Sequence, residues 1–280
     1  MKELVVAVAD LHSNSVVGLF PPEVELSGLG SPLTVLASKA QRTAWRYYCE
    51  FWSLMAEKKK RHKARCTSVF VGDLLEANAR APIKMASHNL ADVVAFGAQV
   101  LEPALAVSDR RFVVRGTNVH GGGHGALEEL LAQDIGAVRD EEARQWSWWW
   151  LTAEIGGVHF KFQHHPMAKS WMPWLMDQSA ARESAIVAAR CMRQHTPIPD
   201  WAVYGHVHYP ADSGIMCHPH VVYLPAWTGL PTVWEHERGI SDIVRPYGGA
   251  WWLIEDGKVL EFDMETYWPR RKKEWKDQSI

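Results

Sequence analysis

Long hydrophobic runs are missing from this sequence, and so is any strong excess of charge. No stretch of about 18 consecutive apolar residues occurs, so the sequence predicts no transmembrane helix. The 30 basic and 32 acidic side chains give a formal net charge of -2. This balance provides no electrostatic reason to expect a nucleic acid or a membrane surface as a partner. We therefore expect a globular protein without membrane contacts.

Cysteine is also scarce, and the sequence has no C-x-x-C pair. The four cysteines are widely separated: Cys49, Cys66, Cys191 and Cys217. This spacing argues against a disulfide framework and against a zinc finger, and it is typical of reduced intracellular thiols. The residues Met1-Lys2-Glu3 run directly into a strand-like segment, unlike a signal peptide. We therefore expect a cytoplasmic location.

Tryptophan and histidine are unusually frequent, with 15 and 14 residues. The tryptophans indicate a large aromatic core or a binding surface, and the histidines suggest metal binding. A chain of 280 residues that is 47% hydrophobic can bury a sizeable core. No repeat, linker or low-complexity segment divides it. We expect a single domain over residues 1–280, in which residues 210–280 are β-rich and complete the second sheet.

Short apolar segments alternate with helical patterns along the chain, which predicts an α/β fold. Residues 15–30 are rich in Gly and Pro and are predicted to form a loop. Two strand pairs are expected, residues 146–151 with 158–163 and residues 250–254 with 259–264. The other predicted strands are 4–9, 67–71, 111–114, 201–204 and 215–224, and the predicted helices are 36–61, 88–106, 126–131 and 179–194.

Side chains that bind metal ions follow five of the predicted strands. They are Asp10 and His12, Asp73, Asn118 and His120, His164 and His165, and His206 and His208. In a parallel or mixed sheet these strand ends would lie at one rim. Residues two apart in an extended segment point the same way, so the two residues of each D-x-H or H-x-H pair can face one site. Carboxylate and imidazole ligands favour Mn, Fe, Zn or Ni over Mg or Ca.

The order D-x-H, G-D, G-N-H, H and G-H-x-H resembles the signature of the calcineurin-like metallophosphoesterases. The matching motifs extend from Asp10 to His208. The resemblance implies a four-layer α/β/β/α sandwich, in which two mixed sheets are flanked by helices and carry a dinuclear metal centre at their edge. The long aromatic helix and the Trp-rich C-terminal part are also similar to phosphoesterases encoded by phages or prophages.

The resemblance further implies a role for each matching residue. One metal ion would be bound by Asp10, His12 and His208, the other by Asn118, His164 and His206, and Asp73 would bridge both. His120 would be the catalytic histidine that contacts the phosphate and assists the leaving group. The family's G-N-H motif is contiguous, whereas here it is spread over residues 116–120, so His124 is an alternative to His120.

The tandem histidines at residues 164 and 165 offer two candidates for one ligand position. The H-x-P pattern of the family favours His164, which leaves His165 to face the substrate. Glu76 and Asn78 follow the Asp73 loop and are interpreted as hydrogen-bonding loop residues rather than as ligands. Arg115 lies at a strand end and is predicted to bind the phosphate group as a bidentate donor.

These assignments predict a metal-dependent hydrolase of phosphate mono- or diesters, with manganese as the preferred metal. Two cations about 3.5–4 Å apart would clamp the phosphoryl oxygens and activate a shared water as hydroxide for in-line attack. A nuclease with the same centre is the alternative, against which the net charge of -2 argues mildly. A non-catalytic metal-binding scaffold is a third hypothesis, but it has no physical need for seven clustered ligands.

Overall fold

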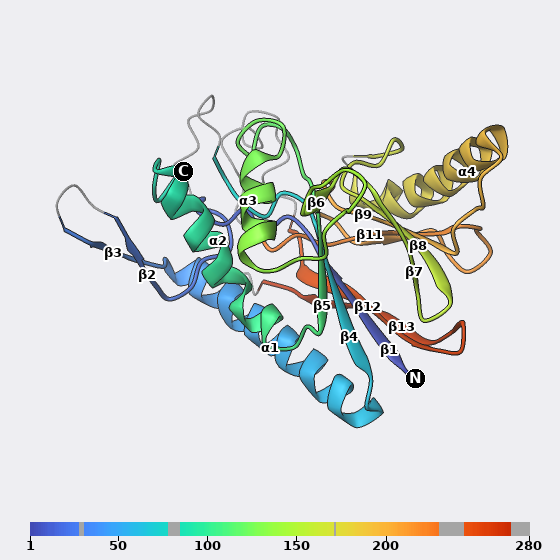
Figure 1. Ribbon diagram of the computed structural model, residues 1–280, viewed down its shortest axis with the longest axis horizontal. Helices are drawn as coiled ribbons and strands as arrows, with labels where there is room; N and C mark the ends of the chain where they lie inside the picture. Colours follow the sequence, from blue (N-terminus) through green and yellow to red (C-terminus); the bar gives the residue numbers. More distant parts are fainter. Residues whose placement is uncertain (28–30, 78–84, 171, 230–243, 270–280) are drawn as a thin grey trace, which may run out of the picture.

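The computed structural model describes residues 1–27, 31–77, 85–170, 172–229 and 244–269. Two mixed β-sheets form its centre (Figure 1), a six-stranded sheet of order β13-β12-β1-β4-β5-β6 and a five-stranded sheet of order β10-β11-β9-β8-β7. A separate hairpin contains β2 and β3. The strands are β1 (Glu3–Val8), β2 (Glu23–Leu26), β3 (Leu33–Leu36), β4 (Arg65–Val71), β5 (Arg110–Val114), β6 (Ser147–Trp148), β7 (Leu151–Ile155), β8 (Val158–Gln163), β9 (Trp201–Tyr204), β10 (Ala211–Asp212), β11 (His220–Tyr223), β12 (Tyr247–Glu255) and β13 (Lys258–Tyr267).

Helices cover the outer faces of the two sheets, and the mixed α/β prediction is confirmed (Figure 1). The six-stranded sheet carries α1 (Lys39–His62), α2 (Leu90–Leu105) and α3 (Ala126–Asp134). The five-stranded sheet carries α4 (Met176–Gln194), which follows the short 3-10 helix η1 (Pro173–Leu175). Alternate residues of β1 face opposite ways, so Leu4 packs under the helices while Val5 packs between the sheets.

The long first helix begins where the sequence provides a cap. Ser38 accepts a hydrogen bond from the backbone N–H of Gln41, and the Gln41 side chain accepts one from the backbone N–H of Ser38. This reciprocal capping box satisfies two amide groups at the helix N-terminus. The buried face of α1 carries Tyr48, Phe51 and Trp52, which pack in the aromatic part of the core.

The sequence predicts one strand over the tryptophan run at residues 146–151. In the structure this segment instead crosses from one sheet to the other. Ser147 and Trp148 pair with β5 of the six-stranded sheet, whereas Leu151 begins β7 of the five-stranded sheet. Between them, Trp149 and Trp150 are 48% and 63% exposed. The predicted pairing of residues 158–163 around the glycine turn is therefore made by β7 alone.

Two other segments differ from their predicted structure. The predicted loop at residues 15–30 contains β2, in which Val24 and Leu26 are buried and the intervening glutamates are exposed. Residues 210–280 are divided between the sheets, because β10 and β11 join the five-stranded sheet while β12 pairs with β1 of the other sheet. The described part of the chain contains no helix that is long and apolar enough to span a bilayer.

Candidate metal centre

Loops that follow β1, β4, β5, β8 and β9 meet at one edge of the two sheets. The loops after β1 and β4 are joined by backbone hydrogen bonds, from Asp10 N to Gly72 O (3.0 Å) and from His12 N to Asp73 O (2.9 Å). The side chain of Asp10 reaches the other sheet, where its Oδ2 accepts a hydrogen bond from His206 N (2.9 Å). The predicted convergence of these strand ends on one rim is what the structure shows.

The two buried aspartates share one arrangement, in which one oxygen is anchored and the other faces the histidines. Asp10 anchors Oδ2 on His206 N, and its Oδ1 lies 3.1 Å from His208 Nε2. Asp73 anchors Oδ1 on the backbone N–H (2.5 Å) and hydroxyl (2.9 Å) of Thr117, and its Oδ2 lies 3.1 Å from His164 Nε2. Both side chains are almost completely inaccessible to solvent.

Two buried atoms at this point have no hydrogen-bond partner among the described residues. They are Asp10 Oδ1 and His164 Nε2, which lie 3.8 Å apart. A buried carboxylate oxygen and an imidazole nitrogen that make no hydrogen bond are costly in an apolar interior. Both atoms are Lewis bases that bind metal ions. The donor set therefore fits a cation between them.

Ligand atoms of the candidate residues form overlapping groups of three, each within 4.8 Å. One group combines Asp10 with His12 and His208, and another combines Asp10, Asp73 and His164. The remaining groups are His164, His165 and His206, and His12, Glu76 and His120. This continuous set spans more than one three-ligand position, which is what a dinuclear centre requires.

His164 is oriented as a metal-binding histidine. Its Nδ1 lies 2.7 Å from the carbonyl oxygen of Val71 and donates a hydrogen bond to it, so Nε2 is the ring nitrogen that faces the aspartates. Metal-bound histidines usually donate their second ring N–H in this way. Burial disfavours a charged ring, but the carboxylates of Asp73 and Asp10 outweigh it and raise the pKa of His164 to about 10. The site thus has a strong affinity for positive charge.

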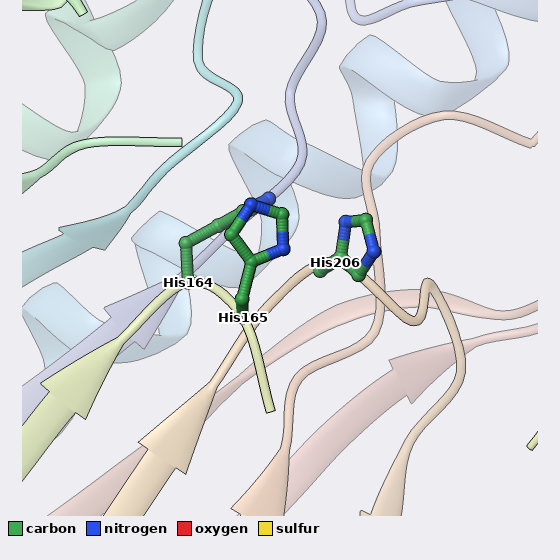
Figure 2. A group of neighbouring side chains, drawn as sticks. All are labelled: His164, His165 and His206. Carbon is green, nitrogen blue, oxygen red and sulfur yellow. The ribbon is translucent and has the colours of Figure 1, made fainter. Parts of the chain in front are cut away.

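The tandem histidines end up in different environments. His164 is 1% exposed, whereas His165 is exposed and its ring centroid lies 4.3 Å from that of His206. Figure 2 shows the rings from the end of β8 beside His206, which follows β9. Burial and the neighbouring His164 and His165 rings lower the pKa of His206 to about 3, so its ring is neutral and able to bind a metal. This geometry favours His164 over His165 as the buried ligand.

Glu76 connects two of the histidines. Its Oε2 lies 2.7 Å from Nδ1 of His120 and 3.5 Å from Nδ1 of His12. A proton on Nδ1 of each ring therefore leaves Nε2 directed away from Glu76. The sequence predicts a hydrogen-bonding loop role for Glu76, and the structure shows that its partners include two imidazole rings. Asn78, for which the same role was predicted, lies outside the described residues.

The structure does not support Asn118 as a metal ligand. Its side chain is exposed, and its Oδ1 accepts a hydrogen bond from the backbone N–H of His124 within a local turn. The residue on the Asp73 carboxylate is instead Thr117, which follows Gly116 directly. The contiguous family motif places its polar residue at this position after the glycine, so the spacing contained the signal for Thr117.

The choice between the two candidate catalytic histidines is clear from their positions. His120 lies against His12 with ring centroids 4.6 Å apart and belongs to the Glu76 group. His124 is exposed, and its backbone groups bond to Asn118 and Arg115. The geometry therefore favours His120.

The structure does not support Arg115 as a phosphate-binding residue. The side chain is buried, and each guanidinium nitrogen already donates to a protein group. Nε bonds to Ser147 Oγ (2.7 Å), and the two terminal nitrogens bond to the carbonyl of His124 (3.3 Å), Glu129 (3.2 Å) and Gln145 (2.9 Å). These bonds tie β5 to α3 and to the start of β6, so the role of Arg115 is structural.

The backbone at the site is held in a strained conformation. Five candidate ligands have positive φ angles, which non-glycine residues rarely adopt: Asp10 (56°), His12 (44°), Asp73 (51°), His206 (71°) and His208 (57°). Such residues cost about 1–3 kcal/mol each and concentrate at functional sites. The fold therefore tolerates strain at the positions where the side chains must converge.

Neither family models nor curated proteins match this sequence. Among solved structures, the fold is similar to a single mutant of Vps29 from Entamoeba histolytica, with a TM-score of 0.40, 11% identity and coverage of 94% of this chain and 99% of that one. It is also similar to a dimetal phosphatase from Danio rerio (0.43, 10%, 94% and 98%) and a hypothetical protein from Thermus thermophilus (0.42, 10%, 96% and 100%). TM-scores this low carry no weight for function, which we infer from the side chains of this chain alone.

Proposed function

We propose that this protein is a metal-dependent phosphoesterase with a dinuclear centre. The observation that carries the proposal is the pair of buried Lewis bases, Asp10 Oδ1 and His164 Nε2, which make no hydrogen bond and lie inside a continuous set of histidine and carboxylate ligands. Asp10, His12 and His208 would hold one cation, and His164 and His206 the other. Asp73 would contribute to both. Manganese is our first choice because mixed carboxylate and imidazole ligands suit transition metals.

When bound, two divalent cations would supply Lewis-acid stabilisation of the phosphoryl oxygens and a nucleophile derived from water at neutral pH. His120 is placed to donate the proton on Nε2 to the leaving oxygen of the ester. Burial disfavours the charged ring, but Glu76 and Asp73 outweigh it and raise the pKa of His120, which favours the protonated ring that can act as a proton donor. Glu76 fixes the ring by accepting from Nδ1.

Metal content and phosphodiester hydrolysis together test the proposal. The protein loaded with Mn²⁺ should retain two ions per chain by mass spectrometry of the metal and should hydrolyse bis(p-nitrophenyl) phosphate. Replacing Asp73→Asn should remove most of both. Asp263→Asn is the matched control, since Asp263 is exposed on β13. A wild-type protein that binds no divalent metal, or binds two without turnover of any phosphate ester, would refute an enzymatic centre.

A nuclease remains our second proposal because two-metal sites serve nucleases as well as phosphatases. The Trp149 and Trp150 side chains, which are exposed beyond β6, could stack on unpaired bases. Degradation of single-stranded DNA by the Mn²⁺-loaded protein, with duplex DNA as the comparison, separates this reading from a small-ester phosphatase. A scaffold role would be favoured only if metal binds and no ester is cleaved.

A further inference from the structure

The predicted phosphate-binding cation, Arg115, is used inside the protein, but a different cation lies beside the candidate metal centre. Nζ of Lys169 lies 3.2 Å from Nε2 of His206. Lys169 is exposed, and no carboxylate partner for it is found in the described part of the chain. A lysine next to a centre that collects positive charge is unfavourable unless an anion joins them.

The loop that carries Lys169 is anchored by hydrogen bonds to side chains of α4 and β11. Oε2 of the buried Glu183 on α4 accepts hydrogen bonds from the backbone N–H groups of Met167 (2.9 Å) and Ala168 (2.7 Å). The carbonyl of Ala168 accepts a further bond from the hydroxyl of Tyr223 on β11. These bonds fix the backbone one residue before Lys169, so the fold sets where its side chain starts, within reach of His206.

Metal binding by His206 would change the partner of Lys169. If His206 coordinates through Nε2, that atom can no longer accept a hydrogen bond. If it coordinates through Nδ1, the proton moves to Nε2, which then repels the ammonium group. In either case the imidazole stops being an acceptor for Lys169. The ammonium group is then free to donate to an oxygen of a bound substrate.

We propose that Lys169 forms an anion subsite at the metal centre, contacts a phosphoryl oxygen of the substrate and favours dianionic phosphate groups. This inference rests on the proposed phosphoesterase function. A dianion gains more from an added positive charge than a monoanion does, because the Coulomb energy scales with both charges. Lys169 therefore biases the site toward phosphomonoesters over phosphodiesters.

Binding of inorganic phosphate to the Mn²⁺-loaded protein by calorimetry tests the subsite without turnover. Lys169→Gln should weaken phosphate binding by about 10-fold, because a charge-assisted hydrogen bond is lost. Lys169→Arg should retain most of the affinity, and metal content should stay at the wild-type level in both variants. Lys258→Gln is the matched control, since Lys258 is exposed at the start of β13, at the other end of the six-stranded sheet.

Substrate preference provides the second measurement. Lys169→Gln should raise the KM of p-nitrophenyl phosphate more than that of bis(p-nitrophenyl) phosphate. Unchanged phosphate affinity in this variant would overturn the subsite while leaving the metal centre intact. Loss of metal from the variant would show that Lys169 only orients His206, which also overturns it. Equal KM changes for both esters would overturn the dianion preference. A wild-type protein without metal would refute the proposed function, and the subsite with it.

Discussion

Glu76 and His120 form a hydrogen-bonded pair in which Nδ1 of the imidazole lies 2.7 Å from Oε2 of the carboxylate. The side chain of Glu76 is 2% exposed and that of His120 is 22% exposed. The pair therefore connects the buried interior of the site to its solvent-accessible part. Burial opposes ionisation of Glu76, but the hydrogen bonds from His12 and His120 outweigh it and lower its pKa to about 2. The carboxylate of Glu76 is therefore ionised at neutral pH.

Replacing Glu76→Gln should reduce kcat by about 10- to 100-fold, the usual cost of losing a group that orients a functional histidine. It should also move the alkaline limb of the kcat–pH profile to lower pH, because His120 loses the negative charge that raises its pKa. A full pH–rate profile in saturating Mn²⁺ is the measurement. Glu57→Gln, an exposed change on α1, is the control. An unshifted alkaline limb would count against His120 as the proton donor.

Thr117 should tune metal affinity through Asp73. Thr117→Val removes the hydroxyl that lies 2.9 Å from Asp73 Oδ1 but keeps the backbone N–H and the side-chain shape. We expect a 10- to 100-fold loss of Mn²⁺ affinity, about the effect of losing an outer hydrogen bond to a ligand. Thr117→Ser should behave as wild type because it retains the hydroxyl. Equal affinities in the Val and Ser variants would contradict this role.

The sequence was sufficient to locate the site but not to complete it. Asp73 could be placed because an apolar strand runs into Gly72-Asp73, and a carboxylate at such a strand end lies at the sheet edge. Arg115 could not be assigned in the same way. Its partners, Ser147 and Glu129, come from segments that only the tertiary fold brings together. A residue's position at a strand end predicts where it lies, but not which partner takes its hydrogen bonds.

The same limit applies to predicting which sheet a buried strand joins. β12 is buried along nearly its whole length and has no alternating pattern that would assign it to one sheet. Its pairing with β1 depends on the packing of Trp252 and Ala250 between the sheets, which is a property of the assembled core. The local hairpin turn was predictable from Asp256-Gly257, whereas the choice of sheet was not.

Gly116 should be essential for stability because the backbone of the Asp73 loop passes directly over it. A Cβ at this position would lie 2.1 Å from Asp73 N and 2.9 Å from Asp73 Cα, which are backbone atoms with little freedom to move. Gly116→Ala should therefore destabilise the fold by about 3 kcal/mol. Gly123→Ala is the control, since its Cβ would meet no atom within 4 Å and only the positive φ is strained. Urea unfolding should show a control loss of about 1 kcal/mol. Equal losses in the two variants would contradict the steric explanation.

Glu128 should make the metal-free protein less stable as the pH rises from about 4.5 to 7. Its carboxylate is completely buried and accepts hydrogen bonds from Leu74 N (3.2 Å) and Gly116 N (2.7 Å). Burial, with a smaller contribution from the charge of Asp73, raises the pKa of Glu128 to about 7 from 4.5. The folded state therefore holds a proton that the unfolded state has lost within this range.

Because the folded pKa is the higher one, the contribution of Glu128 to stability is complete below pH 4.5 and is lost as the pH passes through about 7. The shift corresponds to a loss on the order of 3 kcal/mol. Glu128→Gln cannot ionise, so its free energy of unfolding should fall less than that of the wild type between pH 5 and pH 8. Urea unfolding of both proteins in EDTA measures the difference. Parallel pH dependence in the two proteins would show that Glu128 ionises with an ordinary pKa in the folded state.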